Sequence, residues 1–288
     1  MQPEHADRAG VDGGRSDPAG GIDILNLSKS FDGPEGEIVA LAGVDLAVRE
    51  GEFLSVVGPS GCGKTTMLRI LAGLEKSYGG SVEFAIETGG NPLQSMVFQE
   101  QGVFPWLTVL ENAAYGLTVR HVTRDRRLAQ ARDYLRKLGL SAFETAYPSQ
   151  LSGGMRQRVN LARAFVNDPA VLLMDEPLGS LDEQTKMLVQ TDLLRLWEGS
   201  NKTVIFITHS LDEAIVLGDR VAVMSNRPGR IKTILDIDLP RPRDALELRN
   251  NEHFLHLRRA VWDSLREEVV SLDGAGADLG TAAQAPPS

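Results

Sequence analysis

A glycine-rich segment at residues 58–66 has the residue types and the spacing of a phosphate-binding loop. Its glycines let successive backbone N–H groups wrap around an anion, and the positive end of a following helix points at the same anion. The Lys64 ammonium can reach the β- and γ-phosphates, and the Thr65 hydroxyl can bind Mg²⁺. The segment therefore predicts a nucleoside triphosphate site formed by Gly58, Pro59, Ser60, Gly61, Cys62, Gly63, Lys64, Thr65 and Thr66.

The elements expected around this loop are those that the motif requires. A short apolar run at residues 53–57 predicts a buried strand before the loop, and residues 67–72 predict a helix after it. A glycine-rich turn arising by chance would lack this order of strand, loop and helix. The spacing also differs from the G-x-G-x-x-G pattern of dinucleotide sites.

Two carboxylates end a second apolar strand, because residues 171–177 read Val-Leu-Leu-Met-Asp-Glu-Pro. At the carboxyl end of a core strand, Asp175 can hold the coordination shell of Mg²⁺ beside Thr65. Glu176 can then orient or deprotonate an attacking water. The alternative is that both are solvated acids at the end of a strand.

Two further side chains suit the same site, and a third, Gln99, is by itself an unremarkable polar residue. His209 directly follows the apolar run 204–208, and a neutral imidazole there can contact the γ-phosphate or the water. Phe31 can stack on an adenine ring, and Gln99 follows the apolar residues 96–98. Each has a plainer alternative: a structural histidine, a core aromatic residue and a polar loop residue.

Residues 151–155, Leu-Ser-Gly-Gly-Met, predict the start of another helix with Ser152 as its N-cap. A capped helix that begins with glycines is a second anion site. Because residues 58–66 already serve a nucleotide within one subunit, the second site suggests a composite site shared between two subunits. An ordinary capped helix is the alternative.

Strand and helix patterns alternate along most of the chain. Alternating apolar residues at 22–27 and 44–48 predict antiparallel strands at the start of the fold. The later alternation is typical of an α/β core with a largely parallel sheet. Its expected elements are strand 53–57, a helix after Lys64, strand 171–175, helix 183–197 and strand 204–208.

The middle of the chain differs, because helical periodicity dominates residues 109–166, as in 126–138 and 155–166. It predicts a helical subdomain inserted into the α/β core. The ends of the chain contain little that a core would bury. The expected limits are a disordered leader at 1–21, a domain at 22–237 with the helical insertion at about 100–166, an extension at 238–272 with a helix at 252–270, and a disordered tail at 273–288.

Composition excludes several classes of protein. The formal net charge of −9 over 288 residues argues against a broad nucleic-acid-binding face, which needs clustered Lys and Arg. The longest apolar runs, such as 171–174 and 204–207, are far shorter than the roughly 20 residues that span a bilayer. The N-terminus lacks the apolar core of a signal peptide. Cys62, the only cysteine, cannot form an internal disulfide, which fits a reducing compartment.

Taken together, these residues resemble the ATP-binding cassette (ABC) family over roughly residues 22–237. The resemblance implies an α/β fold: a P-loop NTPase core of RecA-like type with an antiparallel β subdomain and an inserted helical signature subdomain. The family's elements occur in order: aromatic Phe31, the Walker A loop at 58–66, Gln99 of the Q-loop, the signature at 151–155, the Walker B strand ending at Asp175, Glu176, the D-loop with Asp182, and the switch residue His209.

The resemblance also implies cofactors and an assembly. ATP and Mg²⁺ are the expected cofactors, with Thr65, Gln99 and Asp175 as metal ligands. Two chains would form a head-to-tail dimer that encloses each ATP between the Walker A loop of one subunit and the signature of the other. The implied residue roles are catalysis for Lys64, Gln99, Glu176 and His209, and further nucleotide contacts for Ser152, Gly153, Gly154 and Asp182.

A narrower resemblance is to bacterial importers of nitrate, alkanesulfonate and taurine. Residues 97–112, which contain Phe-Pro-Trp, and the segments 227–230 (Arg-Pro-Gly-Arg) and 239–242 (Leu-Pro-Arg-Pro) carry it. It implies ATP hydrolysis that drives uptake of a small anion through two transmembrane permease subunits, with a periplasmic or extracellular solute-binding protein. The chain would then lie peripherally on the cytoplasmic face of the inner membrane. The Phe-Pro-Trp segment would receive a coupling helix, although core packing alone could explain Phe104 and Trp106.

Three residues depart from the commonest family pattern. Met155, Ser180 and Ser210 stand where glutamine, alanine and aspartate are usual. None of these changes removes a group that does chemistry, so they bear on rate or coupling.

A soluble cassette ATPase that acts on DNA or the ribosome, and the ATPase subunit of an exporter, are two alternatives that fit the motifs less well. Chromosome-type cassettes carry a long coiled coil between Gln99 and the signature, and translation-factor types carry two Walker A loops, whereas this chain has neither. An exporter subunit is disfavoured by the short C-terminus and the Phe-Pro-Trp segment. The transported molecule, and whether the second cassette is an identical chain or a paralogue, cannot be read from these residues.

Overall fold

The computed structural model describes residues 20–34, 36–99 and 102–277. The expected disordered leader and tail lie mostly outside this range. Within it, Gly21 already belongs to the first strand, and residues 273–277 belong to the last helix, so the structured chain is slightly longer than expected at both ends.

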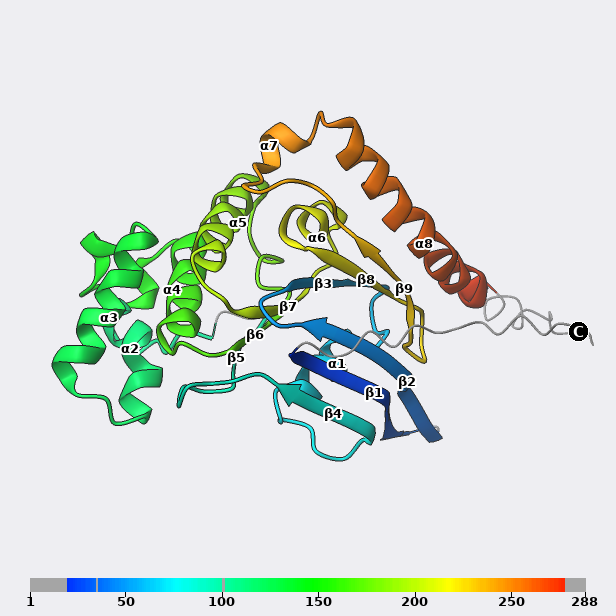
Figure 1. Cartoon of the computed structure of the whole chain (residues 1–288), viewed down its shortest axis with the longest axis horizontal. Coiled ribbons are helices and arrows are strands. Elements are labelled where there is room, and N and C mark those ends of the chain that lie inside the picture. The colour runs from blue at the N-terminus through cyan, green and yellow to red at the C-terminus, as the bar shows by residue number, and fades with distance from the viewer. Residues whose placement is uncertain (1–19, 35, 100–101, 278–288) are drawn as a thin grey trace, which may run out of the picture.

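A three-stranded antiparallel sheet forms the first layer (Figure 1). The two strands predicted there pair as expected, but each is longer than its apolar alternation. A third strand pairs with the first on its other edge, and this strand was not predicted. In spatial order the sheet consists of β2 (Gly36–Arg49), β1 (Gly21–Gly33) and β4 (Gly79–Ala85).

A six-stranded sheet forms the second layer, and its largely parallel character confirms the prediction. Its first five strands are parallel, and the edge strand β9 is antiparallel to β8. In spatial order the strands are β5 (Gln94–Val97), β6 (Val171–Asp175), β7 (Thr203–Ile207), β3 (Phe53–Val57), β8 (Arg220–Met224) and β9 (Ile231–Asp236).

The central strands are buried on both faces, because helices and the first sheet cover them. In β7, Val204 and Phe206 pack on the side of helix α5 (Glu183–Glu198). Ile205 and Ile207 pack on the opposite side, in the cluster that contains helix α1 (Lys64–Leu71) and the first sheet. This double burial explains why the strands are continuous apolar runs rather than alternating ones.

The helical subdomain lies at one end of the molecule, at the left of Figure 1. Its three main helices lie inside the range expected for the insertion. They are α2 (Val109–Val119), α3 (Arg124–Lys137) and α4 (Gly153–Val166), with short 3₁₀ turns at Ser141–Phe143 and Pro148–Gln150. A capping box between Thr108 and Glu111 starts α2, and the Ser152 hydroxyl accepts a hydrogen bond from the Met155 backbone N–H at the start of α4.

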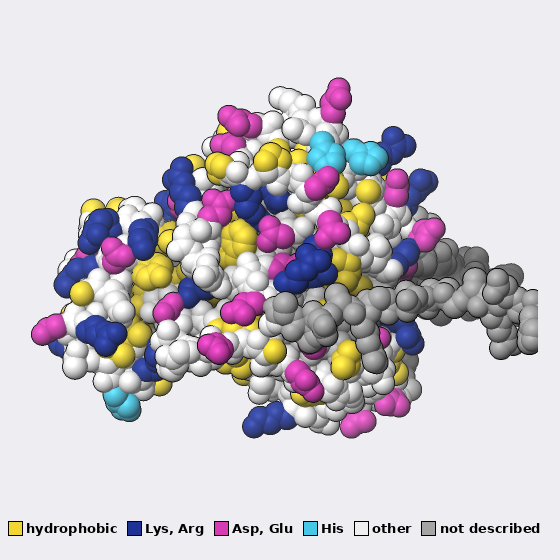
Figure 2. All heavy atoms as spheres, viewed as in Figure 1, with side chains coloured by type: hydrophobic (Ala, Val, Ile, Leu, Met, Phe, Trp, Pro, Cys, Tyr) yellow, Lys and Arg dark blue, Asp and Glu magenta, His cyan; other side chains and the backbone are white. Residues whose placement is uncertain are grey.

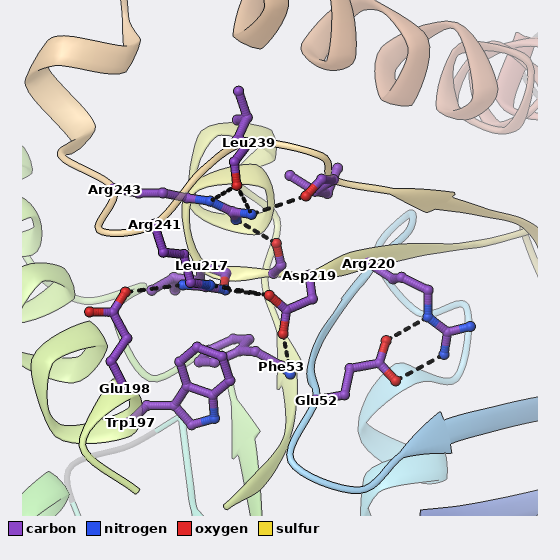
Figure 3. Close-up of polar contacts among 12 residues, drawn as sticks. Glu52, Phe53, Trp197, Glu198, Leu217, Asp219, Arg220, Leu239, Arg241 and Arg243 are labelled. Carbon is purple, nitrogen blue, oxygen red and sulfur yellow. Dashed lines mark hydrogen bonds and ion pairs between the residues drawn. The ribbon is translucent and has the colours of Figure 1, made fainter. Parts of the chain in front are cut away.

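The C-terminal extension returns across the core through an arginine-rich segment (Figure 3). The buried Arg243 guanidinium donates to carbonyl oxygens at the end of helix α6 (Leu211–Leu217), including that of Gly218, and to those of Ile237 and Leu239. Burial lowers the pKa of Arg243 to about 10, so the group stays charged at neutral pH. Arg243 therefore caps α6 and holds the extension against it.

Further charged pairs lie beside this junction. Arg241 lies 4.4 Å from the Trp197 ring and donates to the Asp219 carboxylate at 2.8 Å. Glu52 accepts two hydrogen bonds from Arg220 at 2.5 and 3.1 Å (Figure 3). The chain then forms the short helix α7 (Ala245–Leu248) and the long helix α8 (Glu252–Ala277), which runs along the outside of β8 and β9.

Surface charge is mixed. On the face in Figure 2, Lys and Arg side chains lie among Asp and Glu side chains over the described residues. This face therefore has no continuous basic surface of the kind that nucleic acid requires. Within residues 20–277, apart from the undescribed positions, no helix combines the length and the apolar composition needed to cross a bilayer.

Candidate functional site

The order of the strands in the large sheet brings the predicted site residues to one edge. Gln99 follows β5, Asp175 ends β6, His209 follows β7, and the loop at 58–63 follows β3. Strands β5, β6, β7 and β3 are neighbours and run in parallel, so these residues all lie at their carboxyl ends. In open α/β sheets this edge is where ligands bind.

Backbone geometry in the phosphate-binding loop depends on glycine. Gly63, the residue before α1, has a φ of +101°, and a Cβ there would lie 2.8 Å from the Ala40 carbonyl oxygen. The buried Lys64 ammonium donates to the carbonyl oxygens of Gly58 and Pro59, each at 2.8 Å. These bonds hold the ammonium across the loop, where an anion bound by the backbone N–H groups would meet it.

The pair expected to bind the metal is in contact. The Thr65 hydroxyl donates to an Asp175 carboxylate oxygen at 3.1 Å. Asp175 is 4% exposed, and burial raises the pKa of its carboxyl, with the nearby Glu176 charge adding to the rise and the Thr65 hydrogen bond opposing it. A buried carboxylate beside a hydroxyl suits a hard cation such as Mg²⁺, because the cation would compensate the buried charge.

Glu176 lies at the centre of the predicted catalytic group. One of its carboxylate oxygens is 2.6 Å from His209 Nε2, and the other accepts a hydrogen bond from Gln99 Nε2 at 3.2 Å. Its φ is +46°, an uncommon backbone conformation for a residue other than glycine. The peptide N–H of Glu176 still bonds the Ile207 carbonyl, so the sheet holds the residue in this conformation.

A pocket of about 240 Å³ joins most of these residues. Phe31 lies at its rim with 41% of its surface exposed. Cys62 does not line the pocket, because its side chain is fully buried in the core. This burial also raises the pKa of the Cys62 thiol. The predicted residues that line the pocket are Phe31, Ser60, Gly61, Gly63, Lys64, Thr65, Thr66, Glu176 and His209.

The signature residues and Asp182 do not line this pocket. Ser152 caps α4 as expected, and Asp182 caps α5 by accepting the Thr185 backbone N–H at 3.0 Å. A Cβ on Gly154 would lie 2.3 Å from Thr185 Cγ2, so this glycine also allows α4 to approach α5. Within one chain these residues therefore have structural roles, and their nucleotide contacts stay a prediction about a second subunit.

Core packing does not explain the Phe-Pro-Trp segment. Trp106 is 69% exposed, while the Phe104 ring packs against it and against Tyr115 in tilted arrangements, with ring centroids 5.4 and 4.5 Å apart. Arg163 of α4 lies over the Phe104 ring at 5.3 Å and donates to the Gly102 carbonyl. The segment is thus an exposed aromatic patch that the signature helix supports.

Three pocket residues were not predicted as site residues: Ile38, Ala40 and Arg227. Ile38 and Ala40 lie on β2, opposite the loop, and apolar strand residues carry no chemical signal. Arg227 did carry a chemical signal, because it is a basic residue three positions after the apolar run 221–224. That run is strand β8, which pairs with β3.

Comparisons with known proteins identify the family of the chain. A family model described as ABC transporter matches residues 31–179. The uncharacterized ABC transporter ATP-binding protein MJ0412 of Methanocaldococcus jannaschii is 45% identical over 251 residues, which cover 86% of this chain and 92% of that protein. An aliphatic sulfonates import ATP-binding protein, SsuB of Bacillus cereus, is 40% identical over 243 residues, with coverages of 83% and 94%.

A solved structure supports the fold. The ATP-binding cassette MJ0796, described as a dimeric post-hydrolysis state bound to ADP and Pi, matches with a TM-score of 0.66. The two sequences are 32% identical, and the match covers 76% of this chain and all of that one.

Proposed function

Because this chain belongs to the ABC transporter family, we propose that it is the ATPase subunit of an importer for a small anion such as nitrate, an alkanesulfonate or taurine. The observation that carries the hydrolytic role is the Glu176 carboxylate, held by Gln99 and His209 at the edge of the phosphate pocket. The import role is supported by the similarity to the sulfonate import protein.

The proposed reaction is transfer of the γ-phosphoryl group to water. Glu176 would orient the water and accept its proton, while the ammonium of Lys64 would move from the loop carbonyls to the phosphate oxygens. Thr65, Asp175 and Gln99 would hold Mg²⁺, which neutralises phosphate charge when bound. His209 would keep the Glu176 carboxylate aimed at the water.

We further propose that two chains complete each site. The start of α4, formed by Ser152, Gly153 and Gly154, lies outside the pocket of its own chain. The positive end of this helix can therefore bind a nucleotide held by the partner subunit. Asp182 lies beside them at the start of the adjoining helix α5. A head-to-tail dimer would bring both to the γ-phosphate of the other chain.

The aromatic patch of exposed Trp106 and Tyr115 beside the half-buried Phe104 suits the permease partner. Such an aromatic patch on a surface marks a site of protein association. Through Arg163 and Gly102 it is joined to the signature helix and to the segment that follows Gln99. Docking there would connect a permease to both parts of the ATP site, and would place the chain at the cytoplasmic face of the membrane beside a transporter served by a solute-binding protein.

Replacing Glu176 with Gln tests the hydrolytic role. We expect ATP binding to be kept and the turnover rate to fall by at least about 100-fold, since the general base is lost while the shape is preserved. The rate is measured by phosphate release at saturating ATP. Glu183→Gln, at an exposed acid on α5, is the matched control and should keep full turnover; substantial activity in Glu176→Gln would refute the assignment.

An affinity pull-down tests the transport role. The tagged chain is recovered from detergent-solubilised membranes of its own cell, and its partners are identified by mass spectrometry. A multi-helix permease is the expected partner, and a solute-binding protein would narrow the substrate. Recovery of ribosomal or DNA-bound proteins instead would leave the ATPase chemistry intact and overturn the proposed import.

A further inference from the structure

We propose that Arg227 is a further nucleotide-binding residue, whose guanidinium is a second positively charged side chain, besides Lys64, that contacts the phosphates. It would reach them from the β8 side of the pocket, and Glu268 of helix α8 would hold it in position. This inference rests on the proposed nucleotide site. It adds to that site a residue that the resemblance gave no nucleotide-binding role, and it gives the C-terminal extension a role in the same site.

The topology places Arg227 at the ligand-binding edge. Strand β8 is parallel to β3 and pairs with it on the side opposite β7. The turn after β8 therefore lies beside the phosphate-binding loop, just as His209 and Glu176 lie beside it on the other side. Arg227 lines the same pocket as Lys64, Glu176 and His209.

The guanidinium of Arg227 contacts the loop directly. Its Nε and Nη2 donate to the Gly61 carbonyl oxygen at 3.2 and 3.1 Å. Gly61 has no Cβ, and one built there would lie 3.2 Å from Arg227 Nη2, so the glycine leaves space for this approach. No carboxylate among the described residues pairs with Arg227, and its Nη1 has no protein partner there, which leaves donors for an anion in the pocket.

The turn that carries Arg227 is held firmly on three sides. The Gly229 N–H donates to the Ala40 carbonyl at 2.9 Å, and the Gly229 carbonyl accepts from Ala42 at 3.1 Å, so β2 fixes one side. The phosphate-binding loop forms the second side. A Cβ on Gly229 would lie 2.0 Å from the Cys62 carbonyl oxygen, which shows how closely the turn packs on that loop.

Helix α8 fixes the third side. The Glu268 carboxylate accepts the Asn226 backbone N–H at 2.8 Å and pairs with Lys232 at 3.0 Å. The Asn226 N–H is the main reason that the pKa of Glu268 is lowered, which means that the bond favours the charged carboxylate. Because Asn226 immediately precedes Arg227, α8 sets the position of the arginine through one backbone hydrogen bond.

The test measures the Kd of the full-length chain for mant-ATP by fluorescence. We expect Arg227→Ala to weaken binding about ten-fold, the effect of one charge-assisted hydrogen bond. Arg227→Lys should recover part of the loss. The difference between wild type and Arg227→Ala should shrink as salt rises, because salt screens a contact with phosphate but not apolar packing on the base. Arg230→Ala, in the same turn but outside the pocket lining, is the control and should bind normally.

A double-mutant cycle tests the role of α8. We expect Glu268→Ala to weaken mant-ATP binding in the wild-type chain but to have no further effect when Arg227 is already Ala. Equal affinities of wild type and Arg227→Ala would overturn the proposal and leave the proposed ATPase untouched. If the effects of Glu268→Ala and Arg227→Ala on the mant-ATP binding free energy are additive, the positioning role of α8 is overturned. Failure of the wild-type chain to bind mant-ATP would instead overturn the proposed function itself.

Discussion

Asp175 illustrates how a functional residue can oppose stability. It is buried at the end of a core strand, and burial raises the pKa of its carboxyl above the ordinary value of 3.8. A group with a raised pKa stabilises the fold only while it is protonated, and this contribution is lost as pH rises through the folded-state pKa. At neutral pH its charge is therefore unfavourable in the folded chain, and a bound cation would relieve that cost.

We expect Asp175→Asn to stabilise the nucleotide-free protein while removing its response to Mg²⁺. The amide keeps an oxygen for the Thr65 hydroxyl but buries no charge, so a gain of about 1 kcal/mol, or roughly 2–4 °C in Tm, is anticipated. Thermal unfolding is followed with and without MgATP. Wild type should gain stability on adding MgATP, and the variant should gain little; a variant that melts below wild type without ligand would contradict this account.

At the scale of elements, α4 and α5 share one close contact. Gly154 leads α4 directly against Thr185 of α5, and both helices begin with residues that the nucleotide site is proposed to use. The same glycine therefore serves packing within one chain and, in the proposed dimer, approach to the partner's nucleotide. A substitution of Gly154 alone would change both stability and ATPase rate, so it would not separate the two roles.

A compensating pair separates them. Gly154→Ala should cost roughly 1–3 kcal/mol, because its Cβ meets Thr185 Cγ2 at 2.3 Å. Adding Thr185→Ser removes that methyl group and leaves Cβ at 3.7 Å, an ordinary contact, so the double variant should regain stability. Urea unfolding measures the stability, and ATPase rate measures the function. Recovered stability with a persistently low ATPase rate is expected; no recovery of stability would show that the clash is not the cause.

At the scale of the whole molecule, the two parts of the proposed nucleotide site lie apart. The pocket at the sheet edge contains the loop, Glu176 and His209, whereas the signature at the start of α4 lies outside it. Mixed charge over the face in Figure 2 gives no support to nucleic acid as the partner that joins them. In the proposed head-to-tail dimer, a second subunit would bring the two parts together.

We expect Glu176→Gln to dimerise when ATP is added, because the nucleotide is bound and not hydrolysed. Light scattering after size exclusion should show about twice the chain mass of 31.3 kDa with ATP and a monomer without it. Adding Ser152→Arg should abolish the dimer, since the side chain would obstruct the start of α4. Ser141→Arg, at another exposed serine of the helical subdomain, should leave it intact. A dimer that persists in Ser152→Arg would exclude the signature from the interface.

Residues whose chemistry depends on local spacing could be identified without a structure. The phosphate-binding loop, the Asp175–Glu176 pair and the Ser152 N-cap each consist of a few consecutive residues at the end of a strand or the start of a helix, so a short stretch of sequence shows the whole pattern. The buried parallel strands were predictable for a similar reason, since double burial demands an unbroken apolar run. Strands β4, β5 and β9 are only partly buried and lack so clear a pattern, so they were missed. Strand β8 was missed although its residues 221–224 form such an apolar run.

Tertiary structure alone decided which of these pieces meet. Only the order β6-β7-β3-β8 shows that Arg227 shares a pocket with Lys64, because strand pairing joins segments more than 150 residues apart. Packing likewise decided that Trp106 is exposed, that Cys62 faces the core, and that Gly154 is required by α5. These properties depend on neighbours that are distant in sequence, and only the folded chain brings those neighbours together. Residue type and local spacing therefore determined which chemical groups are present, and the tertiary structure determined what surrounds each of them.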